Sequence, residues 1–138
     1  MDLPEAEARR RFAAARVARM ATSDQSYQPH LVPVTFAVRG DVVVIAIDHK
    51  PKRSTDLKRL RNIAGTGLVS LLVDEYSEDW SRLWWVRADG RAEVLQEARE
   101  EPLDWLAAKY EQYRRARPAG PVIRIQVHRW RGWAATEG

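Results

Sequence analysis

The amino-acid sequence predicts a mainly β fold with some α structure: an antiparallel β-barrel of about six strands with about three helices around it. Two observations carry this prediction. Short apolar runs rich in Val, Ile and Leu recur along the chain, most of them joined by short turns. The helical segments do not alternate regularly with the strands, which favours an antiparallel barrel over a parallel sheet. A length of 138 residues suits a single domain spanning the whole chain.

Composition narrows the classes of ligand and the location. The chain carries 23 basic and 19 acidic residues mixed along its length, which favours anionic ligands and argues against a nucleic-acid-binding tail. It has no cysteine, which excludes disulfides and Cys-bound metals. No apolar run approaches the length of a membrane span, and the acidic N-terminus lacks the pattern of a signal peptide. We therefore expect a cytoplasmic protein.

Prolines and glycines shape the elements predicted for the first 47 residues. Pro33 lacks an N–H group and falls inside a predicted strand, so we expect the ladder to be interrupted there. Gly40 lies in a short hairpin turn, where it is free to take a positive φ. Asp2 is a possible cap for the first helix, with Pro4 in its first turn. The expected elements are a helix over Leu3–Arg16 and strands over Val17–Thr22, Pro29–Val38 and Val42–Ile47.

A basic loop follows the third of these strands. Lys50, Lys52 and Arg53 come just before a helix start at which Ser54 or Thr55 can act as the cap. Free backbone N–H groups and three cations would then converge, so the loop predicts a phosphate-binding site. The alternative is an ordinary solvated loop. Apolar residues at helical spacing indicate the helix itself: Leu57, Leu60 and Ala64.

The second half of the chain adds strands and one long helix. Asp89 and Gly90 form a favoured hairpin pair, so residues 83–95 are either a hairpin or one long strand bent at Gly90. The alternation of the last strand slips near His128–Trp130, which predicts a bulge. Gly65 and Gly67 are expected to end the helix that contains Leu57, Leu60 and Ala64. The expected elements are strands over Gly67–Val73, Leu83–Leu95 and Val122–Trp133, and a helix over Glu97–Arg115.

Seven segments in order carry a resemblance to a known family: VARMAT, PHLVPVTF, DHKPKR with LKRLRNI, LLVDEYSEDW, LWWVRADGRAEV, KYEQYR and IQVHRWRGW. Nearly the whole chain resembles the flavin and deazaflavin oxidoreductases of the split β-barrel superfamily that includes pyridoxamine 5′-phosphate oxidase. The branch that depends on the 8-hydroxy-5-deazaflavin coenzyme F420 is the most similar. The resemblance implies a six-stranded FMN-binding split barrel and a homodimer with two cofactor sites at the subunit interface. It also implies that Gly90 is a bend in one long strand.

The resemblance implies a set of cofactor-binding residues as well. Lys52 would meet the cofactor phosphate with Lys50 and Arg53 beside it, in agreement with the phosphate site indicated by the loop. The interrupted strand would run along the cofactor ring, although Val32 and Val34 could equally be core residues. The residues placed at the ring are His30, Val32, Pro33, Val34 and Thr35, with Ile47 and His49 close to the same pocket.

Charge helps to choose between F420 and FMN. The glutamate tail of F420 rewards a wide basic field, which Lys58, Arg59 and Arg61 would extend along the helix. A solvated helix face is the alternative explanation for these residues. Flavin-binding oxidases of the superfamily tend to have an Arg-x-Val-Leu-Leu-Lys strand, and this chain has VTFAVRG instead. We expect F420, with FMN as the alternative cofactor.

The expected chemistry is hydride transfer between the reduced deazaflavin and a small, planar, electron-poor substrate, and the cofactor supplies most of it. A binding protein for flavin, deazaflavin or haem that does not turn over is the alternative. Trp80, Trp84, Trp85 and Trp133 could line the substrate face or serve as core and interface bulk. Tyr110 and Tyr113 could donate a proton, but their helical spacing favours packing. The three histidines are far apart in the sequence and predict no metal site.

Overall fold

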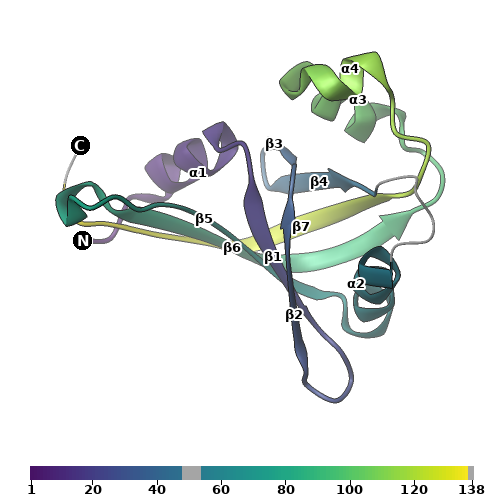
Figure 1. The fold of residues 1–138 in the computed structure, drawn as a ribbon, viewed down its shortest axis with the longest axis horizontal. Coiled ribbons are helices and arrows are strands. Elements are labelled where there is room, and N and C mark those ends of the chain that lie inside the picture. The colour runs from purple at the N-terminus through teal and green to yellow at the C-terminus, as the bar shows by residue number, and fades with distance from the viewer. Residues whose placement is uncertain (48–53, 137–138) are drawn as a thin grey trace.

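A computed structural model describes residues 1–47 and 54–136, with only the backbone for 54–57. In these residues one antiparallel sheet of seven strands has the order β2-β1-β5-β6-β7-β4-β3 (Figure 1). The strands are β1 (Ala18–Ser23), β2 (Pro29–Val34), β3 (Ala37–Arg39), β4 (Val42–Ala46), β5 (Leu68–Glu75), β6 (Trp84–Leu95) and β7 (Val122–Ala134). The helices are α1 (Glu5–Ala14), α2 (Ser54–Thr66), α3 (Glu100–Lys109) and α4 (Glu111–Arg115), with a 3-10 turn, η1, at Trp80–Arg82.

The strand order explains why this sheet curls into a split barrel. The strands β2 and β3 are consecutive in the chain, yet they form the two opposite edges of the described sheet. Only Thr35 and Phe36 separate them, so the sheet must bend until its edges meet at this junction. No ladder joins the two edges in the described residues, and the barrel stays open there. The mainly β, antiparallel prediction agrees with this architecture.

The predicted count of six strands is wrong for the described chain, which has seven. The segment predicted as one strand, Pro29–Val38, is divided into β2 and β3. At the division, the Phe36 N–H donates to the hydroxyl of Tyr110 at 3.2 Å rather than to a neighbouring strand. A side chain 74 residues away therefore replaces the ladder partner at the break.

The helix count also differs, because the predicted helix Glu97–Arg115 is two helices in the structure. Tyr110 separates α3 from α4 and has extended backbone angles, φ −120° and ψ 124°. Its buried hydroxyl donates to the Arg16 carbonyl at 2.8 Å while accepting from Phe36. Forming these bonds turns the chain out of the helix, so the described residues contain four α-helices rather than three.

Three predictions about glycines and the bulge are confirmed. Gly40 has a φ of +57° in the turn between β3 and β4. Gly90 lies inside the single long strand β6, so the hairpin alternative is wrong. Opposite it, Asp89 pairs with Arg129 and Gly90 pairs with Val127, which leaves His128 as the extra residue of a bulge.

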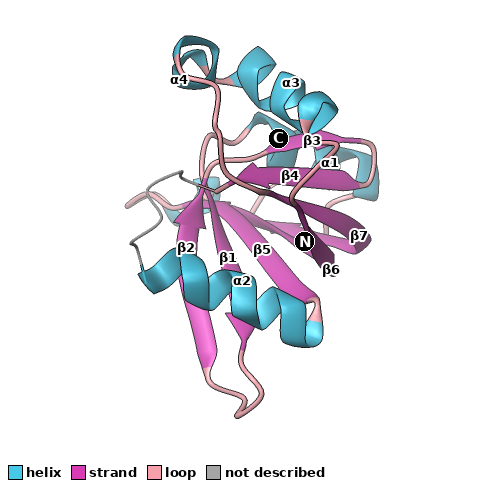
Figure 2. Cartoon of the chain, turned by 90° about the vertical axis from the view of Figure 1, so that its right-hand side faces the viewer, coloured by secondary structure: helices cyan, strands magenta, loops and turns pink. Residues whose placement is uncertain are grey.

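The core lies between the curled sheet and the helices. Phe12 on α1 is fully buried, with its ring 4.9 Å from that of Phe36 and 5.2 Å from that of Trp130. A second cluster lies under α3 and contains Leu103, Leu106 and Tyr110. Helix α2 crosses the sheet on another side (Figure 2). These contacts fix the frame around the junction of β2 and β3.

The N-terminal residues run beside β7 instead of capping α1 as predicted. Pro4 is the residue before the helix, and no side chain caps it. The backbone of Asp2 forms an isolated antiparallel β-bridge with Trp133, and the Leu3 N–H donates to the Gly132 carbonyl at 2.9 Å. The backbone pairing with β7 thus uses the segment that the sequence predicts as a cap.

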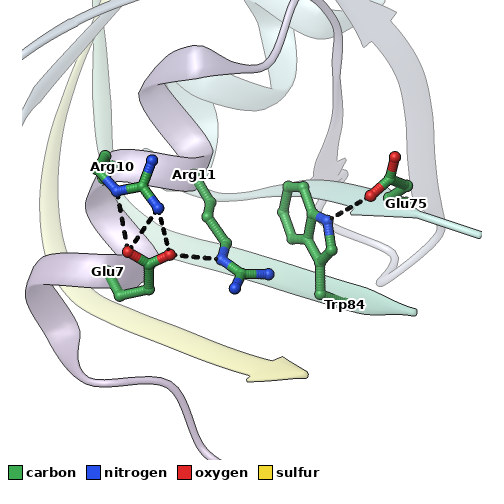
Figure 3. Close-up of polar contacts among 5 residues, drawn as sticks. All are labelled: Glu7, Arg10, Arg11, Glu75 and Trp84. Carbon is green, nitrogen blue, oxygen red and sulfur yellow. Dashed lines mark hydrogen bonds and ion pairs between the residues drawn. The ribbon is translucent and has the colours of Figure 1, made fainter. Parts of the chain in front are cut away.

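A polar cluster attaches α1 to the sheet (Figure 3). Arg11 Nε donates to Glu7 at 2.8 Å, and its guanidinium lies 5.3 Å from the ring centroid of Trp84. The Trp84 indole N–H donates to Glu75 at 2.9 Å. Hydrogen bonds from Arg10 and then Arg11 lower the pKa of Glu7. Trp84 therefore links α1 to β5 through its ring face and its indole N–H group.

Candidate functional site

A cavity of about 440 Å³ lies where the end of β2 meets the end of β4. Helix α2 forms one wall, and α4 with the segment after it forms another. The volume is within the usual range for a small-molecule site. The described lining residues are Pro33, Val34, Thr35, Ile45, Ala46, Ile47, Arg59, Gln112, Tyr113, Ala116 and Pro118.

The strand ends give the cavity its apolar walls. Val34 is the last residue of β2, and Pro33 before it carries no N–H group. On the facing wall, Ile45 and Ile47 are buried at the end of β4. The Ile47 N–H donates to the Pro121 carbonyl at 3.0 Å, which holds the end of β4 against the approach to β7. Two strand ends thus present apolar side chains to the cavity.

Arg59 brings a positive charge to this cavity from α2. Only 7% of its surface is exposed, which is unusual for a guanidinium. The predicted apolar stripe of α2 is rotated in the structure, because Ala64 is exposed while Asn62 and Ile63 are buried. The Asn62 side chain donates to the buried hydroxyl of Thr22 at 3.0 Å, and this bond orients the helix. Arg59 precedes Asn62 and Ile63 by three and four positions, so it shares their face.

A tyrosine–threonine pair crosses the cavity between α4 and the end of β2. The hydroxyls of Tyr113 and Thr35 are 2.6 Å apart, and either one can be the donor. The Tyr113 ring also packs edge-on against Tyr110, with centroids 5.6 Å apart. Both hydroxyl-bearing residues line the cavity, so polar groups lie beside its apolar walls.

The structure brings together part of the predicted site. Pro33, Val34, Thr35 and Ile47 line the cavity. Val32 instead packs against the main core. His30 pairs with Thr22 near the other end of β2. The remaining predicted residues lie outside the described part of the chain: Lys50, Lys52, Arg53 and His49.

The basic residues of α2 lie in different surroundings. Arg59 lines the first cavity, whereas Lys58 and Arg61 line a polar cavity of about 420 Å³ beside the turn between β1 and β2. Lys58 Nζ is 3.6 Å from the Asp24 carboxylate. Arg59 therefore does not belong to a solvated helix face. The apolar pattern of α2 does not predict its burial.

Tryptophans and metal ligands are absent from the described lining. Trp80 is 74% exposed on η1, and Trp85 lies in a groove on the outer face of the sheet. Within the described chain, no three His, Cys, Asp or Glu side chains are grouped as a metal site would require. No helix in that part of the chain is both long and apolar enough to cross a membrane.

Lys109 is a half-buried cation at the end of α3. Its Nζ donates to the Ala15 carbonyl at 2.7 Å and lies 3.8 Å from the ring centroid of Phe36. Burial, and then the charge of Arg16, lower the pKa of Lys109 to about 8. In the unfolded chain the pKa of this amine is about 10.4. Burial of the charged amine therefore lowers the free energy of unfolding by its full amount below pH 8, and by less and less as the pH rises from 8 to 10.4.

We expect wild type to gain stability relative to Lys109→Met between pH 7 and pH 9.5. After allowance for solvent screening, the expected relative gain is about 1 kcal/mol. Urea unfolding of both proteins at each pH measures the difference, and the comparison removes the effect of other titrating groups. A difference that does not change with pH would contradict the lowered pKa of Lys109.

The comparisons with known proteins now identify the family. A model of the pyridoxamine 5′-phosphate oxidase family matches residues 4–134. The chain belongs to this family, as the sequence resemblance predicted. A comparison with curated proteins gives no match.

Solved structures share the fold at low sequence identity. An FAD-binding protein from Mesorhizobium loti has a TM-score of 0.73 and 21% identity, with coverage of 96% of this chain and 95% of that one. The FAD binding protein from Mycobacterium smegmatis has a TM-score of 0.67 and 17% identity, with 96% and 97% coverage. The heme storage protein HutZ from Vibrio cholerae has a TM-score of 0.67 and 15% identity, with 96% and 95% coverage. These similarities concern the fold.

Proposed function

We propose that this protein binds a flavin-type cofactor in the cavity between β2, β4, α2 and α4 and acts as an oxidoreductase. The observation that carries the proposal is the buried guanidinium of Arg59 at the wall of a cavity with apolar side chains at two strand ends. A planar ring suits these apolar side chains, and an anionic phosphate or tail suits the cation. Membership of the pyridoxamine 5′-phosphate oxidase family supports the same class of cofactor.

The described residues fit such a cofactor by their chemistry. Val34, Ile45 and Ile47 offer apolar contact to a ring face, while Thr35 and Tyr113 offer hydroxyl groups to polar atoms at its edge. Arg59 would hold the anionic part. When bound, a deazaflavin or flavin supplies two-electron transfer, and the protein contributes orientation and exclusion of water.

F420 is our proposed cofactor, with hydride transfer to a small, planar, electron-poor substrate. The support is the set of further cations, Lys58 and Arg61, on the same helix as Arg59, which suit a long anionic tail. Lys58 already pairs with Asp24, so its charge is less available to an anionic tail than the sequence predicts. FMN, which needs one phosphate site, remains the alternative cofactor.

Haem storage on the same fold is a less suitable function for this cavity. Haem iron takes His, Cys, Met or Tyr as axial ligands. The described lining contains no His, Cys or Met, so of these ligand types it offers only Tyr113. The cavity therefore favours a ring held by contacts and charge over a metal-centred ligand.

Arg59→Ala is expected to weaken binding of F420 about tenfold to a hundredfold, because a charge-assisted contact of roughly 1.5 to 3 kcal/mol is lost. Titrations followed by fluorescence, with F420 and separately with FMN, measure this change. Arg129→Ala is the matched control, because Arg129 is exposed on β7 and does not line the first cavity. Lys52→Ala should also weaken binding. Unchanged affinity in Arg59→Ala would contradict the site, and tighter binding of FMN than of F420 would reject F420.

A homodimer is part of the proposal. An apolar groove of about 510 Å³ lies on the outer face of β1, β5 and β6, where Leu31 is 67% and Tyr76 69% exposed. Arg19 and Asp74 line the same groove. A two-fold interface uses one patch on both subunits, so the patch must be complementary to itself. An apolar groove that carries charges of both signs is self-complementary, which favours a second copy of the chain as its partner.

Leu72→Glu is expected to produce a monomer in sedimentation velocity at micromolar concentration. Leu72 lies in the groove between Arg19 and Arg87 in the strand register, and a carboxylate there would lose apolar contact area in the interface. Val17→Glu is the control, because Val17 is also exposed but does not line the groove. A Leu72→Glu protein that sediments as a dimer would place the interface elsewhere.

A further inference from the structure

Helix α4 has firmly held flanks and a weakly held middle. On one side, Tyr110 is buried and bonded to Arg16 and Phe36. On the other side, Arg99 donates to the Gly120 carbonyl at 2.8 Å and to that of Pro118 at 3.4 Å. The five residues of α4 contain no buried residue, and the residues at its two caps have extended backbones. A helix this short is unstable without tertiary contacts.

One polar contact joins α4 to the barrel in the described residues, the bond between Tyr113 and Thr35. The other polar side-chain contacts recorded for α4 lead to helices: Arg114 donates to the Ala107 and Ala108 carbonyls of α3, and Arg115 pairs with Glu111. Figure 1 shows α3 and α4 together, to one side of β3 and β4. Within the described residues, this hydroxyl pair is thus the polar link between α4 and the barrel, beside the bonds of Arg114 to α3 and the packing of Tyr113 on Tyr110.

That pair stands at the wall of the cavity. Gln112, Tyr113 and Ala116 line it from the α4 side, and Thr35 lines it from the junction between β2 and β3. Movement of α4 between its fixed flanks would widen the cavity and break the Arg114 bonds to α3, whereas the buried contacts between α3 and the core would stay in place. A bond of this kind contributes about 1 kcal/mol, so the open form can be populated.

We infer that α4 is a lid over the cavity and that Tyr113 and Thr35 form its latch, which controls exchange of the ligand. The inference about exchange rests on the proposed cofactor binding, whereas the latch itself does not. Because the latch closes before any ligand is bound, its opening precedes entry as well as release. Loss of the latch should therefore raise the association and dissociation rates together.

Hydrogen exchange on the ligand-free protein tests the latch. In Tyr113→Phe, the backbone amides of residues 111–116 should exchange about fivefold faster, while those of α3 keep their wild-type rates. Thr35→Val should have the same effect, and the double variant should add nothing, because both changes remove one bond. Tyr27→Phe, at an exposed turn, is the control. Unchanged exchange in residues 111–116 would overturn the latch.

Stopped-flow binding of F420 and of FMN tests the control of exchange. In Tyr113→Phe both rate constants should rise about fivefold. A rise in the dissociation rate alone would overturn the gating inference, because it would mean that Tyr113 is only a ligand contact. If wild type binds neither compound, the proposed function fails, and hydrogen exchange still decides the latch.

Discussion

Gly90→Ala is expected to lower the free energy of unfolding by about 3 kcal/mol or more. A Cβ atom at this position would collide with the carbonyl oxygen of Gln126 and come within 3.0 Å of the Gln126 carbonyl carbon and of Val127 Cα. All three atoms belong to the backbone of β7, so no side chain can rotate away. The strands β6 and β7 would have to separate beside the bulge at His128.

Gly65→Ala is the matched control for this prediction. Gly65 lies inside α2, where an added Cβ would be 3.7 Å from the nearest atom, in the Gln25 side chain. Alanine should there stabilise the protein by roughly 0.5 to 1 kcal/mol. Urea unfolding of wild type and both variants gives the comparison. If Gly90→Ala unfolds at the wild-type midpoint, the close approach of β6 and β7 is wrong.

Phe12→Ala has the second large expected effect, a loss of about 3 to 5 kcal/mol. The side chain is fully buried, and its ring contacts those of Phe36 and Trp130. Truncation leaves a cavity that surrounding rings cannot fill completely. Phe36 belongs to the junction between β2 and β3, so the same change loosens the frame of the candidate site.

A graded series tests this reasoning with the same measurement. Phe12→Leu keeps most of the apolar volume and should cost clearly less than Phe12→Ala. Ala13→Gly, on the exposed side of α1, should cost about 1 kcal/mol through helix propensity alone. If Phe12→Ala costs no more than Ala13→Gly, Phe12 does not anchor α1 to the sheet.

Much of the fold could be predicted from the sequence, and the two main errors have one cause. The strand predicted over Pro29–Val38 and the helix predicted over Glu97–Arg115 are both interrupted in the structure. In each case, the hydroxyl of Tyr110 is involved, because it accepts from Phe36 and donates to Arg16. Local propensity describes neighbours in the chain and contains no information about such a distant bond.

The candidate site was predictable to a similar extent. Pro33 indicates an interrupted strand through its missing N–H group, and it does line the cavity. The sequence groups Arg59 with the other cations of its helix, because Leu57, Leu60 and Ala64 predict a different buried face. The buried face carries the polar Asn62, which donates to Thr22, beside Ile63. An apolar pattern cannot reveal a helix orientation that polar groups determine.

The pairing of β4 with β7 has a consequence for biosynthesis. Val43 pairs with Ile125, so the strand that carries one wall of the cavity finds its long neighbour only after 82 further residues have been synthesised. Such distant pairing slows folding and prolongs the exposure of apolar segments on the ribosome. A nascent chain that lacks β7 would therefore have no formed cavity, although β7 contributes none of its described lining residues.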